Sequence, residues 1–497
     1  MKKAYQKTIS VLGSRLFFWL VVVLFALQAL WVAFSFRYPL PYDEGYHFGL
    51  IKIFSHHLYS PIIANQPHAY DAYRDLFHGG SHLYHYIMAF PYQLISAFTG
   101  DQVKQILALR VINIALFASG LYLFSRLFRK IGIKRIYINI ALLFLVLLPM
   151  TSEVAATINY DNMLFPLTAI FLIYCVRIVM VKSLNWRDYA GVIIFGCFAS
   201  LVQFEFLPIF AAAVIYLIVL AWRGYGKSFF AKLKQSIKKS KKLSLAAAAV
   251  LLIIFVGLFS QVYIADTVKY GTPQPSCAKT LGQKRCDKDV AVIGIYNRLA
   301  ATKNQRPVVA LPNYFLTWSE DMESYTGWSA AVQTNGALTT SGPLPIVYFM
   351  LFAFTIGGLA ILLYAWRSIS KNRSYYFLAT IAFFLVLVEF LVNMMSNYKY
   401  NQPVAIQARY LLPVLPIIMV FIVLAFNSAM RRIRYLKLGF LAVVFVVFIL
   451  GGAGLSTHIL LSQDNWYWQG PKVIKANHAA KKVLAPVIKQ GYTKYGV

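Results

Sequence analysis

Long apolar segments alternate with shorter polar ones along most of the chain. Eight of the apolar segments are nearly free of charge: 16–36, 138–150, 164–180, 245–263, 346–366, 376–392, 410–426 and 438–454. A helix needs about 20 apolar residues to cross a membrane, and modest extensions of the flanks bring most of these segments to that length. The pattern therefore predicts a chain that crosses a lipid bilayer many times. The first segment is too long to be a signal peptide, so we expect it to be retained.

Eleven membrane-spanning helices are predicted once the flanks are included. Their approximate bounds are 16–36, 105–125, 136–154, 162–181, 188–204, 206–223, 244–264, 345–366, 375–395, 409–428 and 436–456. Segment 84–98 is also apolar, but a span there would reverse the side of the basic cluster at 126–135, so we expect a helix lying in the outer interface. The predicted fold class is an all-α polytopic membrane protein, a bundle of about eleven spans with juxtamembrane helices on its outer face.

Composition and charge agree with this prediction and orient it. Hydrophobic residues make up 59% of the chain and the mean hydropathy is +0.61, whereas soluble chains are about 45–50% apolar. The formal net charge of +31 arises because Lys and Arg number 48 against 17 Asp and Glu. The basic residues gather in short segments between spans, at 2–15, 126–135, 227–242, 367–373 and 431–437. Such loops stay cytoplasmic, which predicts a cytoplasmic N-terminus, an extracytoplasmic C-terminus and no nucleic-acid partner.

Two long polar segments are predicted on the outer side, at 37–104 and 265–344. They belong to a membrane domain that covers 1–456, and a basic extracytoplasmic tail follows at 457–497. Loops of this length in a compact protein usually carry function. Cys277 and Cys286 lie in the second segment and would face an oxidising space, so we expect a disulfide, with two free thiols as the alternative.

The first outer segment holds the most unusual group of polar residues. Pro39 and Pro41 keep the chain extended where it leaves the membrane, and the adjacent acids Asp43 and Glu44 follow. Asp43 is expected to cap a helix that runs along the membrane surface to about residue 57. Seven of the nine histidines lie in the same segment: His47, His56, His57, His68, His78, His82 and His85. A solvated helix cap is the simpler interpretation of an isolated Asp–Glu pair, but this concentration of histidines favours a functional site.

Two further polar positions lie at predicted outer edges of the membrane. Asn159-Tyr160-Asp161 occupies the turn between the third and fourth spans, and a carboxylate at that depth usually has a partner or a role. Arg409 begins the tenth span. Its guanidinium would either bind the phosphate of a substrate or reach the lipid headgroups.

In their order and placement, these motifs resemble those of the GT-C membrane glycosyltransferases, which include the protein O-mannosyltransferases and the bacterial aminoarabinose transferases. Asp43-Glu44 and Asn159-Tyr160-Asp161 are similar to the two acidic motifs of that superfamily. The stretch 408–416, Ala-Arg-Tyr-Leu-Leu-Pro-Val-Leu-Pro, is similar to the Gly-Arg-Tyr-Leu-Leu-Pro of a large uncharacterised bacterial group. At 79–82 the chain has Gly-Gly-Ser-His where those enzymes carry Lys-Pro-Pro, so the donor contact of that lysine is not carried over.

The resemblance implies an inverting transferase that moves one sugar from a polyprenyl-phosphate-linked donor to an extracytoplasmic glycan, lipid or protein. Asp43 would be the general base, and Glu44 would hold Asp43 or position the acceptor. Asp161 would act on the acceptor side or hold a metal, and Arg409 would bind the leaving phosphate. Further candidates for substrate binding are Tyr46, His47, Lys52, Arg74, His82 and Tyr84.

The histidines also raise the question of a metal. His47 with Asp43, or other histidines of the loop, would supply ligands for a divalent ion. The remaining candidate ligands are His56, His57 and His85. No spacing matches a known closed site, so no cofactor is predicted as required. Two other functions stay open: a polymerase or ligase of surface polysaccharide, and a transporter or flippase, which would need unusual residues at the bilayer midplane in symmetric halves.

Overall fold

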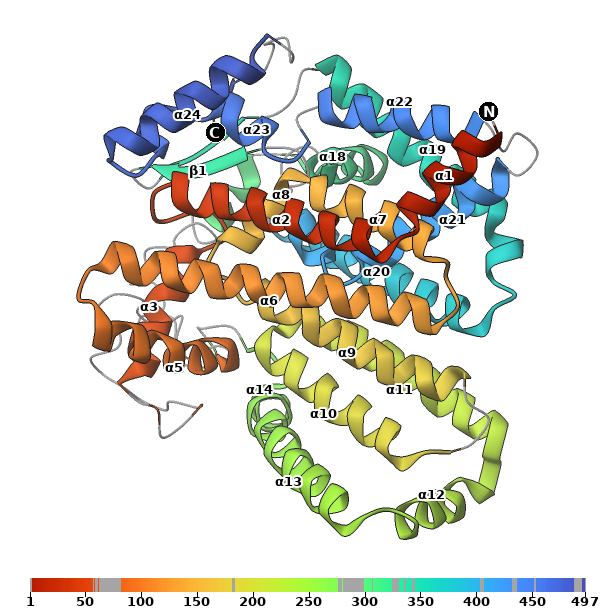
Figure 1. Cartoon of the computed structure of the whole chain (residues 1–497). Coiled ribbons are helices and arrows are strands. Elements are labelled where there is room, and N and C mark those ends of the chain that lie inside the picture. Colours follow the sequence, from red (N-terminus) through yellow and green to blue (C-terminus); the bar gives the residue numbers. More distant parts are fainter. Residues whose placement is uncertain are drawn as a thin grey trace.

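Helices dominate the computed structural model of this chain (Figure 1). The structure describes residues 2–56, 58, 61, 82–180, 184–275, 279, 299–305, 307–323, 330–334, 337–341, 345–402, 406–430, 436–450, 453–486 and 494–496. Arg74, His57, Cys277 and Cys286 lie outside these residues, so the predicted disulfide and two of the predicted site residues remain predictions.

A helix occupies each of the eleven predicted spans. These helices are α2 (Arg15–Ser35), α6 (Gln102–Lys130), the pair α7 (Arg135–Leu147) and α8 (Pro149–Ala156), α9 (Asp161–Met180), α10 (Trp186–Val202), α11 (Leu207–Tyr225), α13 (Lys242–Phe259), α19 (Pro345–Ile369), α20 (Arg373–Tyr400), α21 (Leu415–Ala429) and α22 (Leu436–Leu450). Among the described residues, six helical segments are long and apolar enough to cross a membrane, or seven when α7 and α8, which meet at 71°, count as one span. α21 and α22 are shorter than predicted, at 15 residues each. The predicted fold class, an all-α polytopic membrane protein, is confirmed.

Shorter elements lie between these helices. The α-helices among them are α1 (Lys2–Leu12), α3 (Glu44–Ser55), α5 (Leu83–Phe98), α12 (Phe229–Lys238), α14 (Ala265–Tyr270), α18 (Leu311–Glu323), α23 (Ser456–Leu461) and α24 (Pro471–Leu484). The short 3₁₀ or π segments are η3 (Phe204–Phe206), η4 (Gly226–Ser228), η5 (Ser260–Ile264), η6 (Lys303–Gln305), η8 (Ala408–Leu411) and η9 (Asp464–Trp466). A small antiparallel sheet, which the sequence did not predict, contains β1 (Ala330–Thr334), β2 (Ala337–Ser341) and β3 (Lys494–Gly496) in the order β1-β2-β3. Its register places Val332 opposite Thr339 and Thr340 opposite Tyr495.

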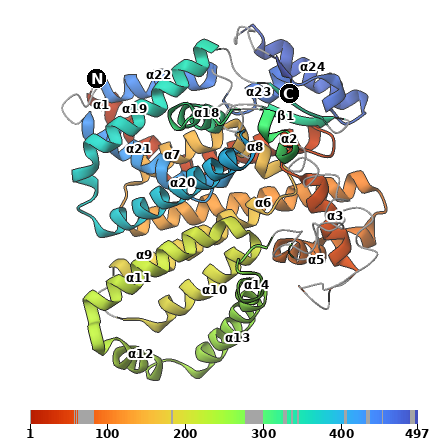
Figure 2. The ribbon, with the colours of Figure 1, turned by 180° about the vertical axis from the view of Figure 1, so that it is seen from behind.

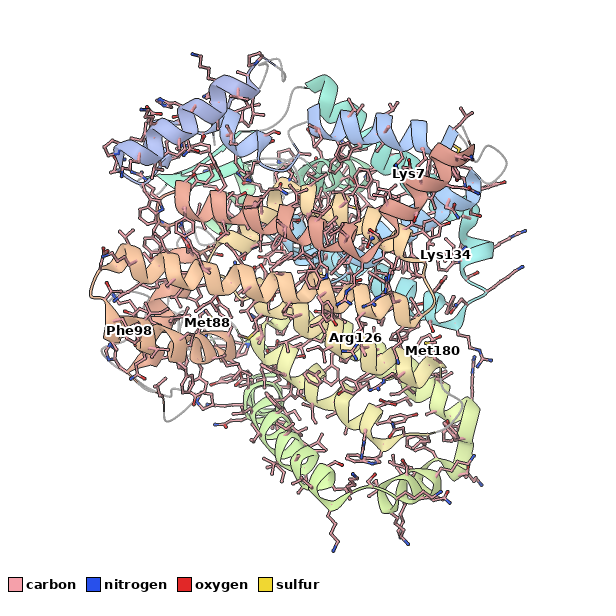
Figure 3. The ribbon with its side chains drawn as sticks, in the orientation of Figure 1. Lys7, Met88, Phe98, Arg126, Lys134 and Met180 are labelled. Carbon is pink, nitrogen blue, oxygen red and sulfur yellow. The ribbon has the colours of Figure 1, made fainter. Side chains whose placement is uncertain are left out.

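The helices form a bundle. In Figures 1 and 2, α10 to α13 make up one side, α19 and α22 make up the opposite side, and α2, α6 and α9 lie between them. The two ends of the bundle differ in their residues. Figure 3 shows Lys7, Arg126 and Lys134 at one end of the bundle and Phe98 at the other. The amphipathic helix α3 and the apolar helix α5, both predicted in the first outer segment, pack against each other at the end that holds Phe98.

Close packing between α6 and α9 fixes the start of α9. Gly120 faces Phe165, and a Cβ atom at position 120 would lie 2.3 Å from the Phe165 ring. The ring also stacks on Phe117 with 4.2 Å between centroids. Because Phe165 is one turn after Asp161, this contact holds the Asp161 end of α9 against α6.

The break between α7 and α8 is stabilised by segments that are distant in sequence. Pro149 begins α8 and the helical ladder is interrupted, which leaves backbone carbonyls without their usual donors. The Gly454 amide donates to the carbonyl of Leu147 at 2.6 Å, and the ring of His458 hydrogen-bonds the carbonyl of Pro149 at 3.2 Å. The chain beyond α22 therefore folds back onto the centre of the bundle.

The C-terminal segment beyond the predicted boundary at residue 456 continues along the end of α2. The Arg37 amide donates to the carbonyl of Trp466 at 2.9 Å, and the Trp468 amide donates to the carbonyl of Ser35 at 3.0 Å. Phe36 and Tyr467 form an isolated antiparallel bridge with stacked rings. The predicted basic tail is thus packed on the first outer segment where that segment leaves the membrane helix.

Candidate active site

Asp43 lies in a strained turn at the beginning of α3. The φ angles of Tyr42 and Asp43 are 65° and 64°, a left-handed conformation that is uncommon for residues other than glycine. Such strain costs on the order of 1 kcal/mol or more per residue and persists where the surrounding structure holds it, often at functional sites. The Asp43 carbonyl accepts the amide of His47, but the Asp43 side chain makes no capping hydrogen bond, so the predicted side-chain cap is wrong.

The Asp43 carboxylate instead faces Arg409. Arg409 Nη2 lies 3.2 Å from Asp43 Oδ2, although the two residues are 366 positions apart in the chain. The Asp43 side chain is 59% exposed, whereas that of Arg409 is 2% exposed. The guanidinium lies over the rings of Tyr42 and Tyr410, at 5.0 and 5.2 Å. The pair therefore joins a buried cation to a carboxylate that solvent can reach.

Arg409 retains hydrogen-bonding capacity that the described structure does not use. Its Nε and Nη1 atoms are buried and have no hydrogen-bond partner among the described residues. Leaving a buried charged donor unsatisfied costs about 1–3 kcal/mol or more. The arrangement is typical of a site that is completed by an anionic ligand, because the planar guanidinium presents several donors to carboxylate or phosphate oxygens.

Asp161 lies beside this pair at the first residue of α9. The side chain of Asn159 accepts the Asp161 amide at 2.8 Å and donates to the carbonyl of Tyr42 at 2.9 Å, so it links the start of α9 to the residue before Asp43. Asp161 is 2% exposed, and its Oδ2 atom has no hydrogen-bond partner among the described residues. A narrow indentation that is lined by Asp161, Leu164, Phe165, Leu412 and Pro413 adjoins it.

Glu44 has a different environment from its neighbour Asp43. Its side chain is fully buried and accepts hydrogen bonds from Arg110 at both oxygens, with 2.8 Å from Nε to Oε1 and 2.7 Å from Nη2 to Oε2. The amides of Leu40 and Ile158 also donate to it, at 2.6 and 3.2 Å. Both oxygens of Glu44 are engaged within the protein and the side chain is not exposed, so Glu44 is placed to hold the turn.

Arg110 ties the same turn to the end of α2. Its Nη1 atom donates to the carbonyls of Ala33 and Phe36 at 2.8 and 2.7 Å. The ring of Trp468 covers the guanidinium at 5.4 Å. Arg110 was not among the predicted site residues, although a lone Arg within the predicted span 105–125 is a detectable signal, because a charge at that depth needs a partner.

A second acid near Asp161 was also missed. Glu205 lies in η3, the short turn between α10 and α11. Glu205 interacts electrostatically with Asp161, and Gln203 interacts with both carboxyl groups. Glu205 therefore belongs to the polar cluster, and its signal in the sequence was an acid between two predicted spans.

His47 and His85 form a buried pair that joins α3 to α5. His47 Nδ1 lies 2.8 Å from His85 Nε2, and the side chains are 1% and 2% exposed. Burial lowers the pKa of His47 to about 3 and that of His85 well below its usual value, so both rings stay neutral. Within the described residues no group of three or more His, Cys, Asp or Glu side chains could hold a metal ion. His56, another predicted ligand, is exposed at the end of α3.

We expect the buried His47 to make the protein less stable as the pH falls below about 6.5. The unfolded chain takes up a proton on this side chain near pH 6.5, whereas the folded protein does so only near pH 3, so stability that is present above pH 6.5 is lost between these values. At pH 5 the loss is about 2 kcal/mol for this group. Thermal unfolding in detergent at pH 7 and pH 5 should show a smaller pH effect for His47→Gln. The exposed His56→Gln should lose as much thermal stability between pH 7 and pH 5 as the wild type does. An equal loss in His47→Gln would contradict the prediction.

The other predicted binding residues lie at varied distances from this cluster. Tyr84 is buried and its hydroxyl donates to Asn113 at 2.8 Å, so it packs α5 against α6. Lys52 is exposed near the end of α3. The Tyr46 and His82 rings lie beside His85, with centroids at 6.0 and 5.4 Å. The structure thus brings together Asp43, Asp161 and Arg409, and it does not bring Lys52 to them.

Comparison with known proteins gives likenesses in structure only. No protein-family model and no curated protein sequence matches this chain. The chain is similar to the crystal structure of ArnT from Cupriavidus metallidurans bound to undecaprenyl phosphate, with 14% identity and a TM-score of 0.46 over 96% of this chain and 73% of that one. It is also similar to ArnT in the apo state, with 14% identity and a TM-score of 0.45 over 94% and 69%.

Proposed function

We propose that this membrane protein is a glycosyltransferase that moves one sugar from a polyprenyl-phosphate-linked donor to an acceptor at the membrane surface. One observation carries the proposal: the buried guanidinium of Arg409 holds Asp43 with one nitrogen and leaves two others without a partner among the described residues. A single site therefore offers a cation for a phosphate and a reachable carboxylate for a hydroxyl group. The acidic motifs that resemble those of GT-C enzymes support the same reaction.

Arg409 would bind the phosphate of the donor. A lipid-linked sugar keeps its polyprenyl chain among the apolar helices and its phosphate at their ends, and Arg409 lies just before the apolar helix α21. The free Nε and Nη1 donors suit two phosphate oxygens, and the low polarity around them strengthens each hydrogen bond. Arg409 would then stabilise the negative charge that develops on the phosphate as the sugar departs.

Asp43 would act as the general base. Its carboxylate would take the proton of an acceptor hydroxyl while the hydroxyl oxygen attacks the anomeric carbon of the sugar. The bond between that carbon and the phosphate oxygen would break, polyprenyl phosphate would leave, and Asp43 would hold the proton. This direct displacement inverts the configuration at the anomeric carbon.

The remaining acids would have separate roles. One carboxylate oxygen of Asp161 has no hydrogen-bond partner among the described residues, and it would accept hydrogen bonds from hydroxyl groups of the sugar or the acceptor. We assign Glu44 to holding the Asp43 turn through Arg110, because both of its oxygens are engaged within the protein. Asp43 precedes α3, which packs against α5 at the end of the bundle that holds Phe98, opposite Lys7 and Arg126. The basic residues at that other end favour an extracytoplasmic site.

A liposome assay with defined donors tests the proposal. The purified protein would be reconstituted with a panel of polyprenyl-phosphate sugars and crude envelope acceptors, and released polyprenyl phosphate would be measured. We expect release that depends on one donor. Arg409→Gln should lower kcat/KM for that donor by about 10- to 100-fold, since a hydrogen bond to a charged group contributes about 1.5–3 kcal/mol. Lys52→Gln, which changes an exposed charge outside the cluster, should match the wild type.

The alternative functions predict different products. A polymerase or ligase of surface polysaccharide would transfer chains of several sugars, which product mass would reveal. A transporter would move labelled donor across the bilayer without releasing polyprenyl phosphate. Absence of release and of binding for every donor would count against the proposed transferase.

A further inference from the structure

The C-terminal helix α24 is attached to the last turn of α2. Asn477, which is 1% exposed, accepts a hydrogen bond from Trp31 Nε1 at 3.1 Å and donates one to Ser35 Oγ at 3.2 Å. Val473 and Ile474, on the same side of the helix, pack against the main hydrophobic core. One face of α24 is therefore fixed to the bundle at the last turn of α2.

The length of α2 sets its last turn at the boundary between the hydrocarbon core and the lipid headgroups. α2 has 21 residues and is about 31 Å long, which matches the roughly 30 Å thickness of the hydrocarbon core. Arg15 begins the helix and Ser35 ends it, so Trp31 to Ser35 occupy the last turn before the polar layer. Tryptophan is common at this level of a membrane. From this length we expect side chains on the outward face of α24 to lie at the level of the lipid headgroups, on the same side as Asp43.

The outward face of α24 is basic. Lys472, Lys475 and Lys482 are exposed, and their spacings of three and seven residues place them on one face of the helix. Within the described segment 453–486 the only acid is Asp464, and it pairs with His478 at 2.7 Å. None of the three lysines has an acidic partner among the described residues.

We infer that this face of α24 binds the phosphate headgroups of anionic lipids in the leaflet next to the site. Each lysine near an anionic surface contributes roughly a fivefold increase in binding. The depth set by Trp31 favours lipid over a soluble polyanion, and Val483, which is 72% exposed beside Lys482, suits contact with acyl chains. The inference concerns a surface away from Asp43 and Arg409 and does not depend on the proposed reaction.

Photo-crosslinking in liposomes tests this surface in the full-length protein. Phosphatidylglycerol or phosphatidylcholine probes with a photoreactive headgroup would be added to phosphatidylcholine liposomes, and crosslinked peptides would be mapped by mass spectrometry. The triple variant K472Q/K475Q/K482Q would be compared with the wild type. Helix α12, whose Lys232, Lys234 and Lys238 lie in the basic loop between α11 and α13, provides an internal control in the same molecule.

We expect the phosphatidylglycerol probe to label residues 471–484 at least about fivefold more than the phosphatidylcholine probe, and the triple variant to lose this difference while labelling of α12 is unchanged. Equal labelling by both probes, or the same preference in the variant, would overturn the inference. A third arm adds soluble polyphosphate to liposomes that contain no anionic lipid. Protection of α24 by polyphosphate, together with no preference for phosphatidylglycerol, would assign the surface to a soluble anionic polymer instead and would also overturn it.

Discussion

Asp43→Asn should lower the rate of sugar transfer by about 10²- to 10⁴-fold while the protein remains folded and binds its donor. The range is the usual contribution of a general base, and Asn cannot take the proton of the acceptor hydroxyl. Its amide has the size of the carboxylate and is accommodated at the exposed position that Asp43 occupies. The loss should therefore fall on kcat, with little change in the KM for the donor.

A matched substitution separates the loss of the general base from the change in net charge. Asp101 is an exposed acid at the start of α6 and caps that helix through the amide of Val103, so Asp101→Asn changes the net charge equally without touching the site. Transfer should be measured as released polyprenyl phosphate, and donor binding should be measured separately by equilibrium binding. Wild-type rates in Asp43→Asn would remove Asp43 from the mechanism and leave the proposed donor specificity intact.

Arg110→Ala should destabilise the protein by about 3–5 kcal/mol. The substitution leaves the Glu44 carboxylate buried without its cationic partner and removes the donor to the carbonyls of Ala33 and Phe36. Breaking a buried ion pair by removing one partner costs this much because the remaining charge stays desolvated. Thermal unfolding in detergent measures the effect, and sugar transfer should fall with it because the Asp43 turn loses its anchor.

Two companion variants identify the cause. Arg126→Ala, at an exposed position near the other end of α6, should leave the unfolding temperature almost unchanged. The double variant Glu44→Gln/Arg110→Met removes both charges, so it should be more stable than Arg110→Ala alone. A double variant as unstable as the single one would show that lost packing, and not an unpaired charge, causes the effect.

The sequence predicted the helices because the membrane imposes a simple rule. Every backbone polar group must be satisfied within the hydrocarbon, so apolar segments of about 20 residues become helices whatever their neighbours are. The predicted spans therefore coincide with helices α2, α6 to α11, α13 and α19 to α22, and the predicted surface helices coincide with α3 and α5. The break after Leu147 was not predicted, although Pro149 marks it.

Contacts between distant residues could not be predicted in the same way. The neighbouring acids Asp43 and Glu44 look alike in the sequence, yet one pairs with Arg409 at a reachable position and the other with Arg110 in the interior. The partners lie 366 and 66 positions away, and no local pattern shows which acid meets which. Apolar periodicity places a residue on a face of a helix, but the neighbour of that face depends on how the helices are arranged.

The packing of the C-terminal segment on α2 has a consequence for the order in which the protein assembles. Chains are synthesised from the N-terminus, so the first outer segment reaches its side of the membrane long before Trp468, which meets Ala33 across 435 positions. Until then the ring that covers Arg110 and the amide that pairs with Ser35 are missing. The Asp43 turn therefore acquires this support only after Trp468 has been synthesised, and in a shorter nascent chain the site is still incomplete.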